Sequence, residues 1–122
     1  MGCEQCSCGS GQLYEACCGR LISGAASAAT AEQLMRSRYS AYTLRDEVYL
    51  LKTWHASTRP PSLSFSDAPQ WRGLKVLKLT ELTVEFVARY KMNGKAEKIH
   101  EKSRFIQESG EWFYLDGELK DS

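Results

Sequence analysis

Cysteine is the residue type in this sequence whose spacing points most directly to a chemistry. All five cysteines of the 122-residue chain lie within its first eighteen positions. Cys6, Cys8, Cys17 and Cys18 form a C-x-C-x8-C-C pattern. Four thiolates suit a closed tetrahedral zinc site, which is structural because no coordination position stays open for water or substrate. Cys3 is left over, but its C-x-x-C spacing with Cys6 would allow it to compete as a ligand.

Disulfide bonding and chance account less well than metal binding for the cysteine cluster. A reducing cytosol disfavours disulfides, and the neighbours Cys17 and Cys18 could bond to each other only through a strained ring. A chance cluster of reduced thiols is the remaining alternative. Residues 3–20 are too few to build a hydrophobic core, so metal binding is the simplest way to order them. We therefore expect one structural Zn²⁺ in this segment.

A second group of residues with possible chemistry lies farther along the chain. Glu101, Asp116 and His55 are the candidates for a general acid or base, because apolar neighbours raise the pKa of a carboxyl group and suit it to proton transfer. Each has a plainer structural interpretation, with His55 as a packed core residue and Glu101 as a partner of Arg38 or Arg89. No nucleophile elbow, phosphate loop or second metal cluster is recognisable in the sequence.

The strands that must position these carboxylates are predicted from two turn signals. The pairs at residues 93–94 (Asn-Gly) and 109–110 (Ser-Gly) favour tight hairpin turns. Counting outward from them, we expect the pairings Glu85 with Lys102, Phe86 with Glu101, Gln107 with Trp112, Phe105 with Tyr114 and Ser103 with Asp116. Because side chains alternate along a strand, Glu101, Ser103 and Asp116 would then share the apolar face.

Helices are predicted before these strands. A capping box begins at Thr30, and apolar residues at three- and four-residue spacing predict an amphipathic helix to about Leu44. Asp46 is suited to cap a second, shorter helix with His55 on its apolar side, and Pro60 ends helical structure. Helices followed by a meandering antiparallel sheet are typical of an α+β domain.

Composition narrows the possible functions. Sixteen basic and fifteen acidic residues give a formal net charge of +1, so no overall attraction to nucleic acid or to an anionic membrane is expected. No apolar run approaches the roughly 20 residues that span a bilayer, and the first residues lack the features of a secretion signal. We therefore expect a cytoplasmic protein without membrane or nucleic-acid partners.

The cysteine pattern, with Gly9-Ser10-Gly11 between its halves, resembles the SEC-C zinc motif first recognised at the C-terminus of bacterial SecA translocation ATPases. The resemblance assigns Cys6, Cys8, Cys17 and Cys18 as the zinc ligands and leaves Cys3 as a free thiol. SEC-C modules there contact the SecB chaperone and ribosomes. The resemblance therefore implies a protein partner from the chaperone, translation or secretion machinery, although the loop between the cysteine pairs lacks the lysines usual in SecA-type motifs.

Similarity to a known family extends over nearly the whole chain. Residues 34–39, 49–55, 71–74, 86–90, 101–105 and 112–117 look like the uncharacterised bacterial YchJ-like family. Membership implies a nuclear transport factor 2-like (NTF2-like) fold, a cone of helices packed on a curved antiparallel sheet. We accordingly expect a SEC-C zinc-binding minidomain at residues 1–20, a linker at 21–29 and an NTF2-like α+β domain at 30–122.

Cones of this fold often enclose a ligand pocket. The residues expected to line it, or else to form ordinary core, are Tyr39, Tyr42, Trp54, Phe86, Ser103, Phe105, Trp112 and Tyr114. Two functions follow. The first is a non-catalytic zinc-binding accessory or adaptor protein whose SEC-C module is a protein-interaction surface. The second is a small-molecule-binding protein, or an isomerase, dehydratase or hydrolase that uses Glu101 or Asp116 with His55 in the cone.

Overall fold

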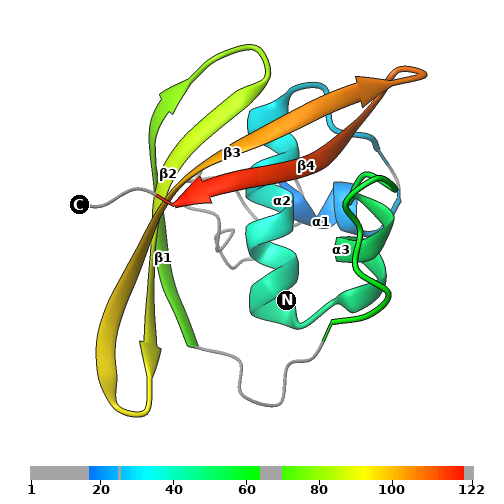
Figure 1. The fold of residues 1–122 in the computed structure, drawn as a ribbon. Coiled ribbons are helices and arrows are strands. Elements are labelled where there is room, and N and C mark those ends of the chain that lie inside the picture. The colour runs from blue at the N-terminus through cyan, green and yellow to red at the C-terminus, as the bar shows by residue number, and fades with distance from the viewer. Residues whose placement is uncertain (1–16, 25, 64–69, 120–122) are drawn as a thin grey trace.

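Within the residues that it describes, a computed structural model of the chain has three helices followed by a four-stranded antiparallel sheet (Figure 1). These residues are 17–24, 26–63 and 70–119. The predicted zinc ligands Cys6 and Cys8 lie outside them, and so does Cys3. The order of the elements confirms the expected α+β fold.

Capping residues decide where two of the helices begin. The helices are α1 (Cys18–Ile22), α2 (Ala31–Leu44) and α3 (Glu47–Lys52). Thr30 caps α2, because its Oγ1 accepts a 3.1 Å hydrogen bond from the N–H of Gln33, and Asp46 caps α3 by accepting a 3.1 Å bond from the N–H of Tyr49. Both caps are the predicted ones. None of the helices in the described ranges is long and apolar enough to cross a membrane.

The sheet is a meander in which each strand pairs with the next along the chain. Its strands are β1 (Gln70–Leu79), β2 (Thr83–Met92), β3 (Lys95–Glu108) and β4 (Glu111–Leu119). The turns at 93–94 and 109–110 have φ values of 52° and 79°, and of 52° and 80°, as a type I′ turn requires. Around the first turn the register is the predicted one, with Phe86 opposite Glu101.

The second hairpin differs from its prediction at one point. The register between β3 and β4 shifts between Arg104 and Phe105, so Ser103 pairs with Gly117 and Arg104 pairs with Asp116. The predicted pairing of Ser103 with Asp116 is therefore wrong. An extra residue on β4 forms a bulge, which a symmetric count from the turn does not include.

The helix α3, which Asp46 caps, is shorter than predicted. It ends at Lys52, and the chain then runs beside β4: the N–H of Tyr114 donates to Thr53 O and the N–H of His55 donates to Tyr114 O, both at 2.8 Å. The predicted position of His55 on a helix face is therefore wrong. An edge strand presents unpaired backbone groups, and pairing with them here replaces further helical hydrogen bonds.

The described helices all lie on one face of the sheet (Figure 1). Buried apolar side chains of α2 meet those of the inward face of β2 and β3, and this core includes Leu34, Met35, Tyr39, Val84, Ala88 and Phe105. In α1, Cys18 packs in this core against Tyr39 and Ala88, and Leu21 packs with Ala41 and Leu50 in a neighbouring cluster, although α1 crosses the boundary expected at residue 20. Burial of these side chains holds the helical layer on the sheet.

Candidate functional site

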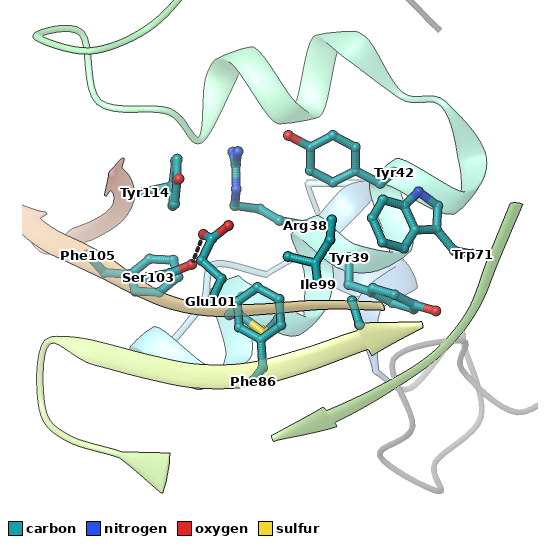
Figure 2. A pocket seen from close by; sticks show the side chains of 12 residues that line it. Arg38, Tyr39, Tyr42, Trp71, Phe86, Ile99, Glu101, Ser103, Phe105 and Tyr114 are labelled. Atoms are coloured by element: carbon teal, nitrogen blue, oxygen red, sulfur yellow. Dashed lines mark hydrogen bonds between the residues drawn. The ribbon is translucent and has the colours of Figure 1, made fainter. Parts of the chain in front are cut away.

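A cavity of about 300 Å³ lies between α2 and the inward face of the sheet (Figure 2). This volume is at the lower end of the range for small-molecule sites. The walls are largely aromatic and aliphatic, with a few polar groups among them. The lining residues are Met35, Arg38, Tyr39, Tyr42, Trp71, Phe86, Ala88, Ile99, Glu101, Ser103, Phe105 and Tyr114.

Arg38 brings a positive charge to the helical wall of the cavity. Its side chain is 5% exposed, and its Nη1 donates 2.8 Å hydrogen bonds to Leu50 O and Thr53 Oγ1. The guanidinium carbon lies 4.6 Å from the ring centroid of Tyr114 and 5.1 Å from that of Trp54. Burial lowers the pKa of Arg38. The side chain still keeps its charge at neutral pH, because the pKa of an arginine starts above about 12.

Glu101 supplies a carboxylate from the opposite wall. Its Oε2 accepts a 2.6 Å hydrogen bond from Ser103 Oγ, which lies on the same inward face of β3. Gly117 leaves the space that this carboxylate fills, because a Cβ at that position would lie 2.2 Å from Oε2. Figure 2 shows the other carboxylate oxygen pointing away from Ser103 into the cavity. The partner of Glu101 is thus a serine on its own strand and not one of the arginines considered from the sequence.

The aromatic wall is braced by ring contacts. Tyr39 meets Trp71 edge to face at a centroid distance of 5.8 Å, and Phe105 meets Tyr114 at 5.8 Å. Burial raises the pKa of Tyr114, and the negative charge of Glu101 raises it further. Tyr114 is therefore a neutral phenol at physiological pH, able both to donate and to accept a hydrogen bond.

Asp116 does not reach the cavity. It lies opposite Arg104, whose side chain alternates with those of Ser103 and Phe105 and so projects from the other face of the sheet. Arg104 Nε donates a 2.6 Å hydrogen bond to Asp116 Oδ1, and Nη2 bonds the second carboxylate oxygen. The hydrogen bond from Arg104 lowers the pKa of Asp116. The bulge described above is the physical reason why this carboxylate faces outward.

His55 also lies away from the cavity lining. Its Nε2 is 2.9 Å from Glu108 Oε2, and its Nδ1 is 2.7 Å from Ser57 Oγ. The ring packs edge to face against Phe113 at 6.1 Å. The structure therefore does not bring Glu101, Asp116 and His55 together.

Of the eight residues expected in the pocket, Trp54 and Trp112 do not line it. Trp54 stacks behind Arg38 and meets Tyr114 edge to face at 5.1 Å. Trp112 donates from its indole nitrogen to Ala29 O at 3.3 Å and borders a separate hollow of about 110 Å³. The other six expected residues are lining residues.

Five lining residues were missing from the sequence prediction, and four of them carry a recognisable signal. Met35 and Arg38 precede Tyr39 and Tyr42 at the three- and four-residue spacing of one helix face. Ala88 follows Phe86 by two residues and Ile99 precedes Glu101 by two, which places them on the inward face of their strands. Trp71 had no comparable signal, because its position depends on a register shift in β1.

The described part of the cysteine cluster consists of Cys17 and Cys18. Their Sγ atoms lie 3.9 Å apart, close to the separation of about 3.8 Å between two vertices of a ZnS4 tetrahedron with Zn–S bonds near 2.3 Å. Their geometry therefore fits two ligands of one zinc ion. Cys18 is 1% exposed and packs against Tyr39 and Ala88, which are also cavity walls.

The architecture and the cavity place the chain in the NTF2-like class. The family model described as "YchJ, middle NTF2-like domain" matches residues 30–117, and the SEC-C motif model matches residues 4–20. The chain belongs to the YchJ family, which confirms the resemblance identified from the sequence.

Relatives of the chain carry the family name UPF0225. A UPF0225 protein of Cupriavidus metallidurans is 52% identical over 127 residues, covering 95% of this chain and 89% of the relative. One from Streptomyces avermitilis is 50% identical, covering 93% and 84%. The solution structure of a SEC-C motif containing protein from Rhodopseudomonas palustris aligns with a TM-score of 0.84 at 36% identity, covering 95% of this chain and 98% of that one. A crystal structure of a SEC-C motif containing protein from Psychrobacter arcticus aligns at 0.75 with 26% identity, covering 99% and 85%.

Proposed function

We propose that this chain binds a small molecule in the cone, in the cavity between α2 and the sheet. The observation that supports the proposal is the convergence of Arg38 and Glu101 on an otherwise apolar space of about 300 Å³. A charged group withdrawn from water destabilises a fold unless it is paired, and an apolar side chain would fill a purely structural core better. A ligand with complementary polar groups accounts for both charges.

The proposal is binding, with catalysis as the alternative. The two groups that the sequence offered as partners for Glu101 in proton transfer do not lie beside it, because Asp116 pairs with Arg104 on the other face and His55 pairs with Glu108. An isomerase, dehydratase or hydrolase at this site would have to use Glu101 as its one carboxylate among the lining residues.

Ligand-observed NMR with a fragment library tests the binding proposal. The Ala88→Leu change adds volume inside the cavity, and Val87→Leu adds volume on the other face of the same strand. We expect fragments that bind the unmodified chain and Val87→Leu but not Ala88→Leu. A library without cavity binders, or binders unaffected by Ala88→Leu, would contradict the proposal.

We also propose that the SEC-C segment holds one structural Zn²⁺ through Cys6, Cys8, Cys17 and Cys18 and acts as a protein-interaction surface in the cytoplasm. Supporting this are the motif match at residues 4–20 and the 3.9 Å separation of the Cys17 and Cys18 sulfurs. When bound, the ion would order the segment and supply no open coordination position. Cys18 links the segment to the cavity wall through Tyr39 and Ala88.

Elemental analysis of protein purified without chelator tests the zinc proposal. We expect about one zinc per chain in the unmodified protein and in Cys3→Ser, and loss of zinc in Cys17→Ser. Capture from cytosolic extract with the unmodified chain and with the Cys17→Ser, Cys18→Ser double variant then tests the adaptor role. A partner retained by both proteins would not depend on the zinc module.

A further inference from the structure

The charge of Arg38 is unusual for a group so well removed from water. Among the described residues no carboxylate lies within 4.0 Å of its guanidinium. The groups that surround it are a backbone carbonyl, a hydroxyl, two aromatic faces and the phenol of Tyr42, all of them neutral. The hydrogen bonds to Leu50 O and Thr53 Oγ1 both leave from Nη1, and the phenol of Tyr42 is a third hydrogen-bond partner, whereas an arginine has five N–H donors on three nitrogens. The helical wall of the cavity is therefore built to receive an anionic group.

The opposite wall has the reverse chemistry. Glu101 is held by Ser103 through one carboxylate oxygen, and Gly117 leaves the space in which that oxygen sits. The second oxygen faces the cavity as an acceptor (Figure 2). A ligand atom beside it must donate a hydrogen bond, because a carboxylate repels another acceptor at contact distance.

The size and the remaining surface of the cavity limit the rest of the ligand. A volume of about 300 Å³ corresponds to about ten water molecules. Phe86, Ile99, Phe105 and, apart from its indole N–H, Trp71 offer apolar or aromatic surface across most of it. The ligand therefore has a compact apolar or aromatic body.

We infer that the ligand is a small carboxylic acid with an apolar body and a hydroxyl or amino donor, its carboxylate on Arg38 and its donor on Glu101. This inference rests on the proposed binding function and specifies its ligand class. The two ends of such a molecule match the two charges of the cavity. A simple fatty or aromatic acid would satisfy Arg38 but would offer no donor to the second carboxylate oxygen of Glu101, the one that Ser103 does not bond.

Three probes of nearly equal size test the inference by isothermal titration calorimetry. Phenyllactate carries the carboxylate and the hydroxyl, phenylpropionate lacks the hydroxyl, and phenyllactamide lacks the charge. We expect phenyllactate to bind about tenfold or more tightly than phenyllactamide, since hydrogen bonds to charged groups are about twice as strong as neutral ones. Phenylpropionate should bind more weakly than phenyllactate by a smaller factor.

Variants connect these affinities to the two walls. Glu101→Gln removes the negative charge, so phenylpropionate should bind it more tightly than the unmodified chain, and the preference for phenyllactate should shrink. Arg38→Met should abolish binding of both acids, while Arg38→Lys should restore part of it. Because Arg38 also holds Leu50 O and Thr53 Oγ1, circular dichroism must show that its variants fold. The comparison of probes on the unmodified chain does not depend on them.

The outcomes separate the ligand class from the binding function. If phenyllactamide binds in the cavity as tightly as phenyllactate, the ligand class is wrong while the binding function stands. Acid binding that Glu101→Gln leaves unchanged would place the donor elsewhere and also overturn the inference. If no probe perturbs the NMR signals of the Trp71 indole or the Arg38 side chain, and the fragment library gives no cavity binder, both proposals fail.

Discussion

Gly117 allows a sharp test of the Glu101 site. A Cβ at this position would lie 2.2 Å from Glu101 Oε2 and 2.7 Å from its Cδ, which is roughly 1 Å inside normal contact distance. In the Gly117→Ala variant the carboxylate must therefore move by a similar amount, because the backbone of β4 is held by its ladder with β3. The 2.6 Å hydrogen bond from Ser103 cannot survive that displacement.

The expected loss follows from that bond. A hydrogen bond to a charged group contributes about 1.5–3 kcal/mol to stability. Replacing glycine by alanine stabilises the fold by about 0.4–1 kcal/mol, because it lowers the conformational entropy of the unfolded chain. The net change in the free energy of unfolding should be a loss of about 0.5–2.6 kcal/mol. Urea denaturation followed by tryptophan fluorescence measures it.

Two further variants make the test specific. Gly73→Ala is the matched control in β1, since a Cβ there would meet nothing within 4 Å, and it should leave stability nearly unchanged. In a Glu101→Ala background the clash partner is absent, so Gly117→Ala should no longer destabilise the chain. An equal loss with and without Glu101 would refute the reasoning, because the cost would then come from the backbone and not from the carboxylate.

The other predictions address the outer face, the helical layer and the zinc segment. The pKa of Asp116 lies below its ordinary value of 3.8. Its pairing with Arg104 should therefore add stability above about pH 4, and this stability is lost as the pH falls through the folded-state pKa. NMR titration should show that the pKa of Asp116 rises in Arg104→Ala. Thr53→Val should lower the free energy of unfolding by about 1–3 kcal/mol, because Thr53 Oγ1 accepts from buried Arg38. Thr58→Val, at an exposed position, should lower the free energy of unfolding by less in the same denaturation assay. Removal of zinc by a chelator should disorder residues 3–20 and loosen the packing of Cys18 on Tyr39, while the hairpins persist. Amide exchange measured by NMR can follow these changes residue by residue. Simultaneous melting of the whole sheet would contradict this prediction.

Much of the fold was predictable because its signals are local. Thr30 and Asp46 cap their helices with their own side chains, and the turns at 93–94 and 109–110 require residues that tolerate positive φ. From the first turn, the period-two alternation of a strand was enough to place Glu101 on the inward face. Each of these features depends on groups that lie within a few residues of one another in the sequence.

The parts of the site that could not be predicted depend on contacts between distant segments. The bulge next to Arg104 turned Asp116 outward and brought Gly117 beside Glu101. Similarly, the backbone of residues 53–55 forms hydrogen bonds with the edge of β4, so His55 is not part of the helix. Counting residues outward from a hairpin turn cannot reveal an extra residue in one strand. Helix periodicity likewise carries no information about a strand edge that competes for the same backbone groups.

By itself the sequence therefore determined the α+β order, the hairpin turns, the inward carboxylate and the family of this protein. Tertiary structure alone decided that Arg38, one of several arginines on the chain, is the cation buried at the cavity. Its position on the helix was readable from spacing, but its burial depends on Leu50, Thr53 and the faces of Trp54 and Tyr114 closing around it. Those groups come from α3, the segment that follows it and β4, and only the packed fold brings them together around a residue of α2.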